Sequence, residues 1–387
     1  AALEAIVEHA DVFENPSSSY PAAKRARQLL EGARADVAAL AGSRPEEVIF
    51  TGSGTEAINL ALHGVALARP GERTHVITSA IEHAATLATC RRLQQFGVEV
   101  DYLPVESDGL ICPEAVRRAL KPHTKLIAVM HANNEVGTVQ PIREIAAIAR
   151  SAGVRFLTDA VQTAGKLPLD FAGTGIDLMA MSAHKFHGPK GVGALIKRHD
   201  LHLVPLINGG GQESGLRSGT ENLIGVLGMA AAAREARHGL AAKAEQVERL
   251  RYRLCEGLLA LGDVQINGDI SRCLPGTLNV SFRFIKGDAL ATALAFDGIA
   301  VSTGSACHAK EAKPSHVLVA LGLGREWLTG AIRFSLGASN TAAEVDYVIQ
   351  CVAIAVRKLR AMSPLAGRAL AGVMGTMTAD RSVGAVV

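Results

Sequence analysis

The chain has 387 residues, of which 48% are hydrophobic and 20% are charged, and its 40 lysines and arginines nearly balance its 37 aspartates and glutamates. This length predicts one large and one smaller domain, because domains usually hold roughly 100–200 residues. The sequence has no apolar run near the ~18–20 residues of a membrane span, and no dense basic block typical of a nucleic-acid surface. Its six cysteines form no CxxC pair, which argues against a metal site and favours reduced thiols in the cytoplasm.

The first half of the chain alternates between strand and helix patterns. The sequence opens at Ala1 without an initiator methionine, so we expect some N-terminal residues to be missing. Residues 11–42 predict a helical lead-in that ends at Gly42. From Glu47 to Ile196, short β-rich runs such as EVIFT and HVITS alternate with helical runs such as GTEAINLALHGVAL. This alternation predicts a mostly parallel sheet with helices on both faces.

The second half predicts a smaller α+β domain. An Ala-rich helical stretch at 223–262 is followed by the strand pattern LNVSF, a helix near 287–296 and an amphipathic helix around 342–361. We therefore expect, in chain order, an N-terminal segment, a large α/β domain, a smaller α+β domain and a tail of open role, at residues 1–10, 11–210, 211–365 and 366–387.

A Gly-rich turn follows the first predicted strand. In TGSGTEAINL (51–60) the turn opens a helix, so backbone amides near Gly54 and Thr55 can hold a phosphate. The same stretch matches the loose G-x-G-x-x-A dinucleotide fingerprint, with Glu72 or Glu82 as the acidic ribose partner. This match keeps an NAD-dependent oxidoreductase as an alternative function. A tight turn before a capped helix also explains the pattern.

Two polar residues lie at predicted strand ends. Asp159 in FLTDAVQTAG can pair with a protonated ring nitrogen or cap a helix. Lys185 in MSAHKFHGPKGVG can form an imine where its pKa is lowered. Pyridoxal phosphate requires an imine lysine, a carboxylate for its ring nitrogen and a phosphate cradle. The combined set therefore favours pyridoxal 5'-phosphate as the cofactor.

The segment SAHKFHGPKG resembles the cofactor-lysine segment of the cysteine desulfurases of the NifS/IscS type, which are class V aminotransferases. Other segments resemble this family in the same order over about residues 11–365, including ENPSSS, SAIEHAA, MHANNEVGTVQPI, GGGQESGLRSGTEN and AIRFSLG. The resemblance implies the aspartate-aminotransferase-like fold, fold type I of pyridoxal-phosphate enzymes. It also implies a homodimer that removes sulfur from L-cysteine, leaves L-alanine, and passes the sulfur to an acceptor or iron–sulfur scaffold protein.

The resemblance also implies a role for individual residues. Lys185 would form the imine, Asp159 would pair with the pyridine nitrogen, and His83 would stack on the ring and help to move protons. Gln162 would donate a hydrogen bond to the ring hydroxyl oxygen. The implied phosphate contacts are Gly54, Thr55, Ser182, His184 and, from a second subunit, Thr220. The implied substrate contacts are Asn134, Asn15 and Arg333.

Cys307 lies in VSTGSACHAKEAKPS, whose small and polar residues predict a mobile loop. Neighbouring His308 and Lys310 can lower the pKa of its thiol. The resemblance implies that Cys307 takes the substrate sulfur as a persulfide, and STGSAC resembles the NifS/IscS branch rather than the branch with Arg-x-Gly-His-His-Cys. A selenocysteine lyase or another β-eliminating lyase on the same scaffold stays an alternative. A non-catalytic scaffold is a further alternative if the short strand that begins family members is truly absent.

Overall fold

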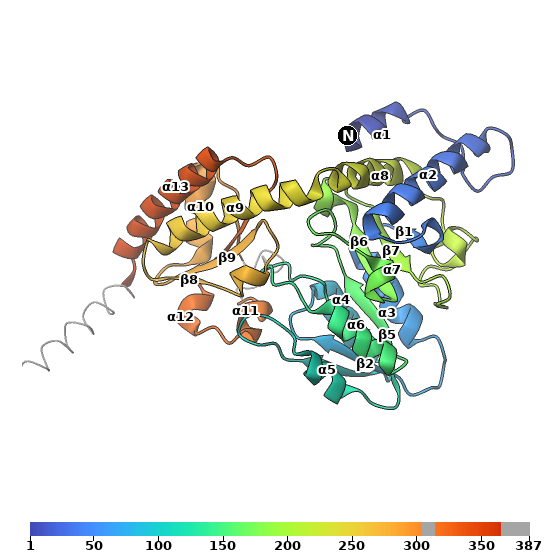
Figure 1. Cartoon of the computed structure of the whole chain (residues 1–387), viewed down its shortest axis with the longest axis horizontal. Coiled ribbons are helices and arrows are strands. Elements are labelled where there is room, and N and C mark those ends of the chain that lie inside the picture. The colour runs from blue at the N-terminus through green and yellow to red at the C-terminus, as the bar shows by residue number, and fades with distance from the viewer. Residues whose placement is uncertain (304–313, 365–387) are drawn as a thin grey trace, which may run out of the picture. The chain divides into compact units, whose positions relative to one another are not determined.

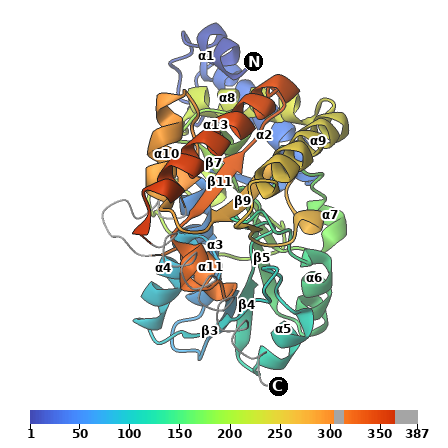
Figure 2. The same cartoon turned by 90° about the vertical axis from the view of Figure 1, so that its left-hand side faces the viewer.

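The computed structural model describes residues 1–303 and 314–364, which divide into two compact units (Figures 1 and 2). The large unit comprises Ala1–Glu245 with Ser271–Leu274, and the small unit comprises Gln246–Ile270 with the chain from Pro275 onward. The large unit extends beyond residue 210, where the sequence suggested a boundary. The reason is that helix α8 (Leu223–Arg237) packs against α2 (Ala23–Ala41) and completes the core of the large unit.

The large unit is built on a seven-stranded sheet in the order β1-β7-β6-β5-β4-β2-β3. Its strands are β1 (Val48–Thr51), β2 (His75–Ser79), β3 (Glu99–Leu103), β4 (Thr124–Ala128), β5 (Arg155–Asp159), β6 (Leu178–Ser182) and β7 (Gly193–Lys197). Strands β3, β2, β4, β5 and β6 are parallel, and β7 runs antiparallel between β6 and β1. The predicted mostly parallel sheet is confirmed, and the carboxyl ends of all its strands except β7 lie at one edge.

Helices cover both faces of this sheet, because successive strand residues point to opposite sides. Ile49 and Leu126 face a core that includes α3 (Gly54–Ala66) and α4 (Ala84–Gln94). Phe50 and Ile127 face the opposite core. That second core includes α2, α5 (Pro113–Ala119), α6 (Ile142–Ser151) and α8. The strands are therefore buried on both faces, as their nearly continuous apolar runs require.

Glycines with left-handed backbone lie at or just after the ends of two helices. Helix α2 ends at Gly42, as predicted, with a left-handed φ of 68°. The predicted Ala-rich helical stretch at 223–262 forms α8 and α9 (Leu240–Leu259), which are separated by the extended His238 and by Gly239 with a φ of 64°. The remaining helices of the large unit are α1 (Ala2–Glu8) and α7 (Phe171–Thr174), with 3₁₀ turns η1 (Pro45–Glu47), η2 (Ala183–Phe186) and η3 (Glu213–Gly215).

The small unit has a four-stranded antiparallel sheet in the order β10-β11-β9-β8. Its strands are β8 (Val264–Ile266), β9 (Thr277–Phe282), β10 (Ser302–Thr303) and β11 (Ala331–Ser335). Its helices after α9 are α10 (Gly287–Phe296), α11 (His316–Ala320), α12 (Arg325–Leu328) and α13 (Ala342–Ala361). Within residues 1–303 and 314–364, no helix is both long and apolar enough to cross a bilayer.

Candidate active site

The carboxyl edge of the large sheet gathers most of the predicted site residues. Asp159 ends β5, Ser182 ends β6, and Gly54 opens α3 after a two-residue turn from the end of β1. The register pairs Thr51 with Gly193 and Gly193 with Ser182, so the start of α3 lies beside the end of β6. Open α/β sheets bind their ligands at this edge. The topology thus brings together residues that are more than a hundred positions apart in the sequence.

The N-terminus of α3 forms a cradle suited to a phosphate. The Ser53 side chain caps the helix by accepting a hydrogen bond from Glu56 N at 3.1 Å, while the first-turn amides of Gly54 and Thr55 have no intrahelical acceptor. A Cβ on Gly54 would lie 2.7 Å from Val161 Cγ2 and 3.2 Å from Ser182 Cβ. Only glycine therefore lets the positive end of the helix approach β6 this closely.

Ser182 and His184 lie on the β6 side of this cradle. Ser182 is buried, and its Oγ lies 3.0 Å from His184 Nδ1. Partial desolvation of the His184 ring and the positive charges of Lys185 and Lys190 lower the pKa of this histidine. A neutral imidazole joined to a hydroxyl provides uncharged hydrogen-bonding groups at the same place as the helix amides.

Asp159 is a buried carboxylate at the centre of the edge. It is 8% exposed, and its Oδ1 accepts a hydrogen bond from Val161 N at 2.8 Å. Burial raises its pKa to about 6, although the Val161 hydrogen bond and the charge of Lys185 act in the opposite direction. The helix-cap alternative is not supported, because residues 161–166 form turns rather than a helix. A protonated ring nitrogen would stabilise such a buried carboxylate.

His83 and Gln162 each have one side-chain atom already engaged. His83 is the N-cap of α4, and its Nδ1 accepts a hydrogen bond from Ala85 N at 3.1 Å. A neutral His83 imidazole therefore carries its proton on Nε2. Lys166 Nζ donates to Gln162 Oε1 at 3.1 Å, which leaves the amide nitrogen of Gln162 as the donor for another group.

The structure also locates the other predicted residues that it describes. Lys185 is exposed in η2, close enough to Asp159 for its charge to act on that carboxylate. Asn134 is half-buried in the turn after β4, and Asn15 Oδ1 accepts a hydrogen bond from Ser17 N at 2.9 Å. Arg333 belongs to β11 of the small unit. Cys307 lies outside the described residues.

Thr220 lies on the loop that follows η3 in the large unit. It is exposed, and with Gly52 and Arg217 it lines a pocket of about 210 Å³. Arg217 Nε donates to Glu56 Oε1 at 2.9 Å, and Gly52 N donates to Glu56 Oε2 at the same distance. No short motif in the sequence points to Glu56 or Arg217, because the two residues are 161 positions apart.

The two acidic candidates for a nucleotide ribose have other partners. Glu72 pairs with Arg69 and Lys125 on the surface, and Glu82 is buried against Ser79 and Met130. Strand β1 lies at the end of the strand order and pairs with the antiparallel β7, whereas the dinucleotide fingerprint belongs to a parallel βαβ unit. The geometry therefore does not support the NAD-dependent alternative.

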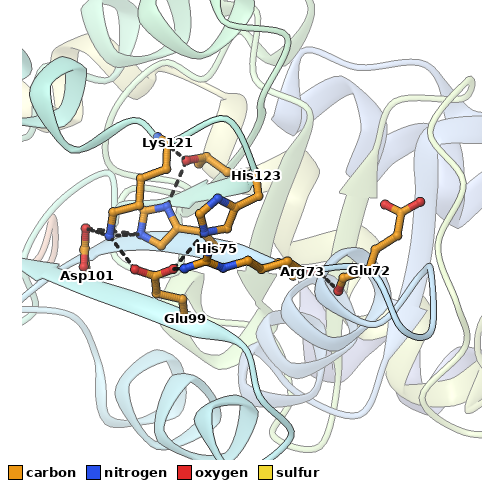
Figure 3. Close-up of polar contacts among 9 residues, drawn as sticks. Glu72, Arg73, His75, Glu99, Asp101, Lys121 and His123 are labelled. Carbon is orange, nitrogen blue, oxygen red and sulfur yellow. Dashed lines mark hydrogen bonds and ion pairs between the residues drawn. The ribbon is translucent and has the colours of Figure 1, made fainter.

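A second polar cluster lies at the opposite edge of the large sheet (Figure 3). Lys121 Nζ donates to Asp101 Oδ2 at 2.7 Å and to Glu99 Oε1 at 2.9 Å, and His123 Nε2 lies 2.7 Å from Glu99 Oε2. The buried His75 has its Nε2 3.2 Å from Asp101 Oδ2. No group of three or more His, Cys, Asp or Glu side chains in the described part of the chain is arranged to hold a metal ion. These residues instead neutralise one another and tie β2, β3 and the start of β4 together.

Comparisons with known proteins agree with this geometry. The Aminotransferase class-V family model matches residues 2–348. Cysteine desulfurase IscS from Dictyoglomus turgidum is 42% identical over 353 residues, which cover 91% of this chain and 90% of that protein. Among solved structures, a NifS-like protein matches with a TM-score of 0.86 and 39% identity, covering 91% of this chain and 94% of that one. The structure of SspA in complex with cysteine matches with a TM-score of 0.78 and 36% identity, covering 88% of this chain and 96% of that one.

Proposed function

Because the chain belongs to the class-V aminotransferase family and, within it, to the pyridoxal-phosphate-dependent cysteine desulfurases, we propose that it takes sulfur from L-cysteine at the carboxyl edge of the large sheet. The observation that carries this proposal is the buried Asp159 carboxylate beside the open N-terminus of α3 and the Lys185 amine. These three features match the ring nitrogen, the phosphate and the carbonyl carbon of the cofactor.

Each end of the cofactor has suitable residues. When bound, pyridoxal phosphate acts as an electron sink that weakens the bonds at the substrate's α-carbon. Lys185 would hold the cofactor through its amine, and Asp159 would hold the protonated ring nitrogen. The amides of Gly54 and Thr55, with Ser182 and His184, would hold the phosphate.

His83 and Gln162 would act on the reaction's protons and on the ring hydroxyl of the cofactor. The Nδ1 atom of His83 already accepts a backbone hydrogen bond, so Nε2 is the atom at which this side chain would hold or release a proton while stacking on the ring. Gln162 would use its amide nitrogen toward the ring hydroxyl oxygen, because its Oε1 already accepts from Lys166.

We infer that the substrate sulfur passes to Cys307. L-Cysteine and the Cys307 thiol would give L-alanine and a Cys307 persulfide, in which one S–S bond forms as the substrate C–S bond breaks. Asn15, Asn134 and Arg333 would bind the substrate, with the Arg333 guanidinium forming paired hydrogen bonds to its carboxylate. Delivery of the sulfur to an acceptor or iron–sulfur scaffold protein would complete the cycle.

We also propose a cytoplasmic homodimer. Thr220 is exposed on a loop held by hydrogen bonds from Ser218 Oγ to Gly210 O at 2.7 Å and from Gly219 N to Gln212 Oε1 at 3.1 Å. Such a loop supports a role for Thr220 at the cofactor phosphate of a second subunit. The described cysteines are all free thiols, which supports a reducing compartment such as the cytoplasm.

The decisive experiment is incubation of the pyridoxal-phosphate-loaded protein with L-cysteine, followed by an alanine assay and mass measurement of the Cys307 peptide. We expect alanine and one added sulfur on that peptide, and we expect Cys307→Ala to lose the bound sulfur while keeping the cofactor. Cys273→Ala is the matched control, since Cys273 is a half-buried thiol of the large unit. Unchanged sulfur release by Cys307→Ala would favour a β-eliminating lyase instead.

The cofactor lysine is tested separately by reduction with borohydride. We expect the mass of the cofactor to stay on the Lys185 peptide, and to disappear in Lys185→Ala. Lys190→Ala should retain it, because Lys190 is an exposed neighbour without an expected role at the cofactor. Cofactor mass on any other lysine would exclude the assignment of Lys185.

A further inference from the structure

Glu82 is a buried acid that the proposed reaction does not use. It directly precedes His83, is 1% exposed, and belongs to the turn between β2 and α4. Ser79 Oγ donates to Glu82 Oε1 at 2.6 Å. Met130 N donates to both carboxyl oxygens, at 3.0 Å and 3.1 Å. A side chain from one turn therefore satisfies the backbone of the next turn along the carboxyl edge.

A second hydrogen bond joins the same two turns. Asn133 Nδ2 donates to Ile81 O at 2.9 Å, and Asn133 Oδ1 accepts from the amides of Glu135 and Val136. The turn after β4 is also bonded to the end of β5, because His131 N donates to Asp159 O at 2.9 Å. The hydrogen bonds form a continuous chain from the turn that carries His83, through the turn that carries Asn134, to Asp159.

The charge state of Glu82 suits this position. Burial raises the pKa of Glu82 to about 8, with the negative charge of Asp159 adding to the effect and the Ser79 and Met130 hydrogen bonds opposing it. The acid is therefore mostly neutral near pH 7, and Asp159 keeps the negative charge that a protonated ring nitrogen needs. A neutral acid can tie the two turns together without competing for that cation.

We propose that Glu82 is a positioning residue that ties the His83 turn to the turn after β4 and so sets where the His83 imidazole lies. The part of this proposal that concerns the cofactor rests on the proposed function of His83. In the neutral acid the carboxyl hydrogen can be donated to Ser79 Oγ, because a hydroxyl both donates and accepts. Glutamine can replace this acid, since its amide can donate to Ser79 Oγ in the same way and its oxygen can accept from Met130 N. Alanine removes both contacts and leaves Met130 N without this acceptor.

The test compares Glu82→Gln and Glu82→Ala in the pyridoxal-phosphate-loaded protein, with and without His83→Ala. We expect Glu82→Ala to move the pH midpoint of the cofactor absorbance by about 0.5 unit or more, which is a threefold change in proton affinity, and Glu82→Gln to leave it near the wild-type value. In the His83→Ala background, Glu82→Ala should cause no further shift of the midpoint, because the effects of substitutions at coupled residues do not add.

Asp177→Asn is the matched control for a merely structural effect. Asp177 is another buried acid of the large unit, and its Oδ2 accepts from Phe156 N at 2.9 Å. Its replacement should lower the melting temperature without moving the absorbance midpoint. A shift by Glu82→Ala that persists without His83, or an equal shift in Glu82→Gln, would overturn the proposal.

A measurement on the cofactor-free protein separates this proposal from the proposed function. The rate at which diethyl pyrocarbonate modifies His83, read from peptide masses, should change about threefold or more in Glu82→Ala and stay unchanged in Glu82→Gln. His123, in the cluster at the opposite edge, serves as the internal reference (Figure 3). An unchanged His83 rate in Glu82→Ala refutes the positioning role even if the wild-type protein takes up no cofactor. If Glu82→Ala does not fold, Glu82→Asp replaces it, because the aspartate side chain is one methylene shorter and its carboxyl group does not reach Met130 N.

Discussion

Replacing Gly54 with alanine tests whether the close approach of α3 to β6 creates the phosphate cradle. The new Cβ would lie 2.7 Å from Val161 Cγ2, a methyl group on a β-branched side chain that has little freedom to rotate. The start of α3 must therefore shift, and overpacking of this kind costs about 1–3 kcal/mol. At about 2–4 °C per kcal/mol for a domain of this size, we expect the melting temperature to fall by about 2–12 °C.

The shift should also weaken cofactor retention, because it moves the amides of Gly54 and Thr55. Losing a hydrogen bond to a charged group costs about 1.5–3 kcal/mol, which corresponds to about tenfold or more in affinity. Thermal unfolding and cofactor release during dialysis measure the two effects. Gly32→Ala is the control, since nothing lies within 4 Å of its Cβ position in α2, and alanine there should stabilise the helix by about 0.5–1 kcal/mol. Unchanged melting and cofactor retention in Gly54→Ala would refute the reasoning.

Three further predictions concern stability. Arg34→Ala should cost about 3–5 kcal/mol in denaturant unfolding, because Glu213 would lose both 2.8 Å hydrogen bonds from Arg34 while staying buried. Ser214→Gly should instead stabilise the protein by about 1 kcal/mol, since Ser214 adopts a left-handed φ of 58°; a loss of stability there would contradict this account of strain. Hydrogen bonds from Lys121 and His123 lower the pKa of Glu99 to about 2. Glu99 thus contributes stability above its unfolded pKa of about 4.3, and this contribution is lost as the pH falls toward 2. Glu99→Gln should therefore make stability depend less on pH between about 4.3 and 2 in acid unfolding followed by circular dichroism. A pH dependence parallel to that of the wild type would contradict this contribution of Glu99.

The sequence by itself determined the local elements and indicated the chemistry of the proposed site. The pattern HVITS predicted β2 at its observed bounds, and Gly42 predicted the end of α2, because strand periodicity and left-handed helix ends depend on neighbouring residues alone. The motifs around Gly54, Asp159 and Lys185 indicated the cofactor because each of them can also be recognised from neighbouring residues alone. Each motif combines a strand end with a residue type that the cofactor requires.

Only the tertiary structure decided which residues meet. The reversed direction of β7 and the resulting alignment of β1 with β6 depend on strand pairing, which no local pattern encodes. The hydrogen bonds that Glu82 accepts from the amide of Met130 cannot be predicted from a local pattern either, because Met130 is 48 residues further along the chain. Burial of Glu82 and Asp159 raises the pKa of both acids, and burial exists only once the sheet and its helices have closed around them.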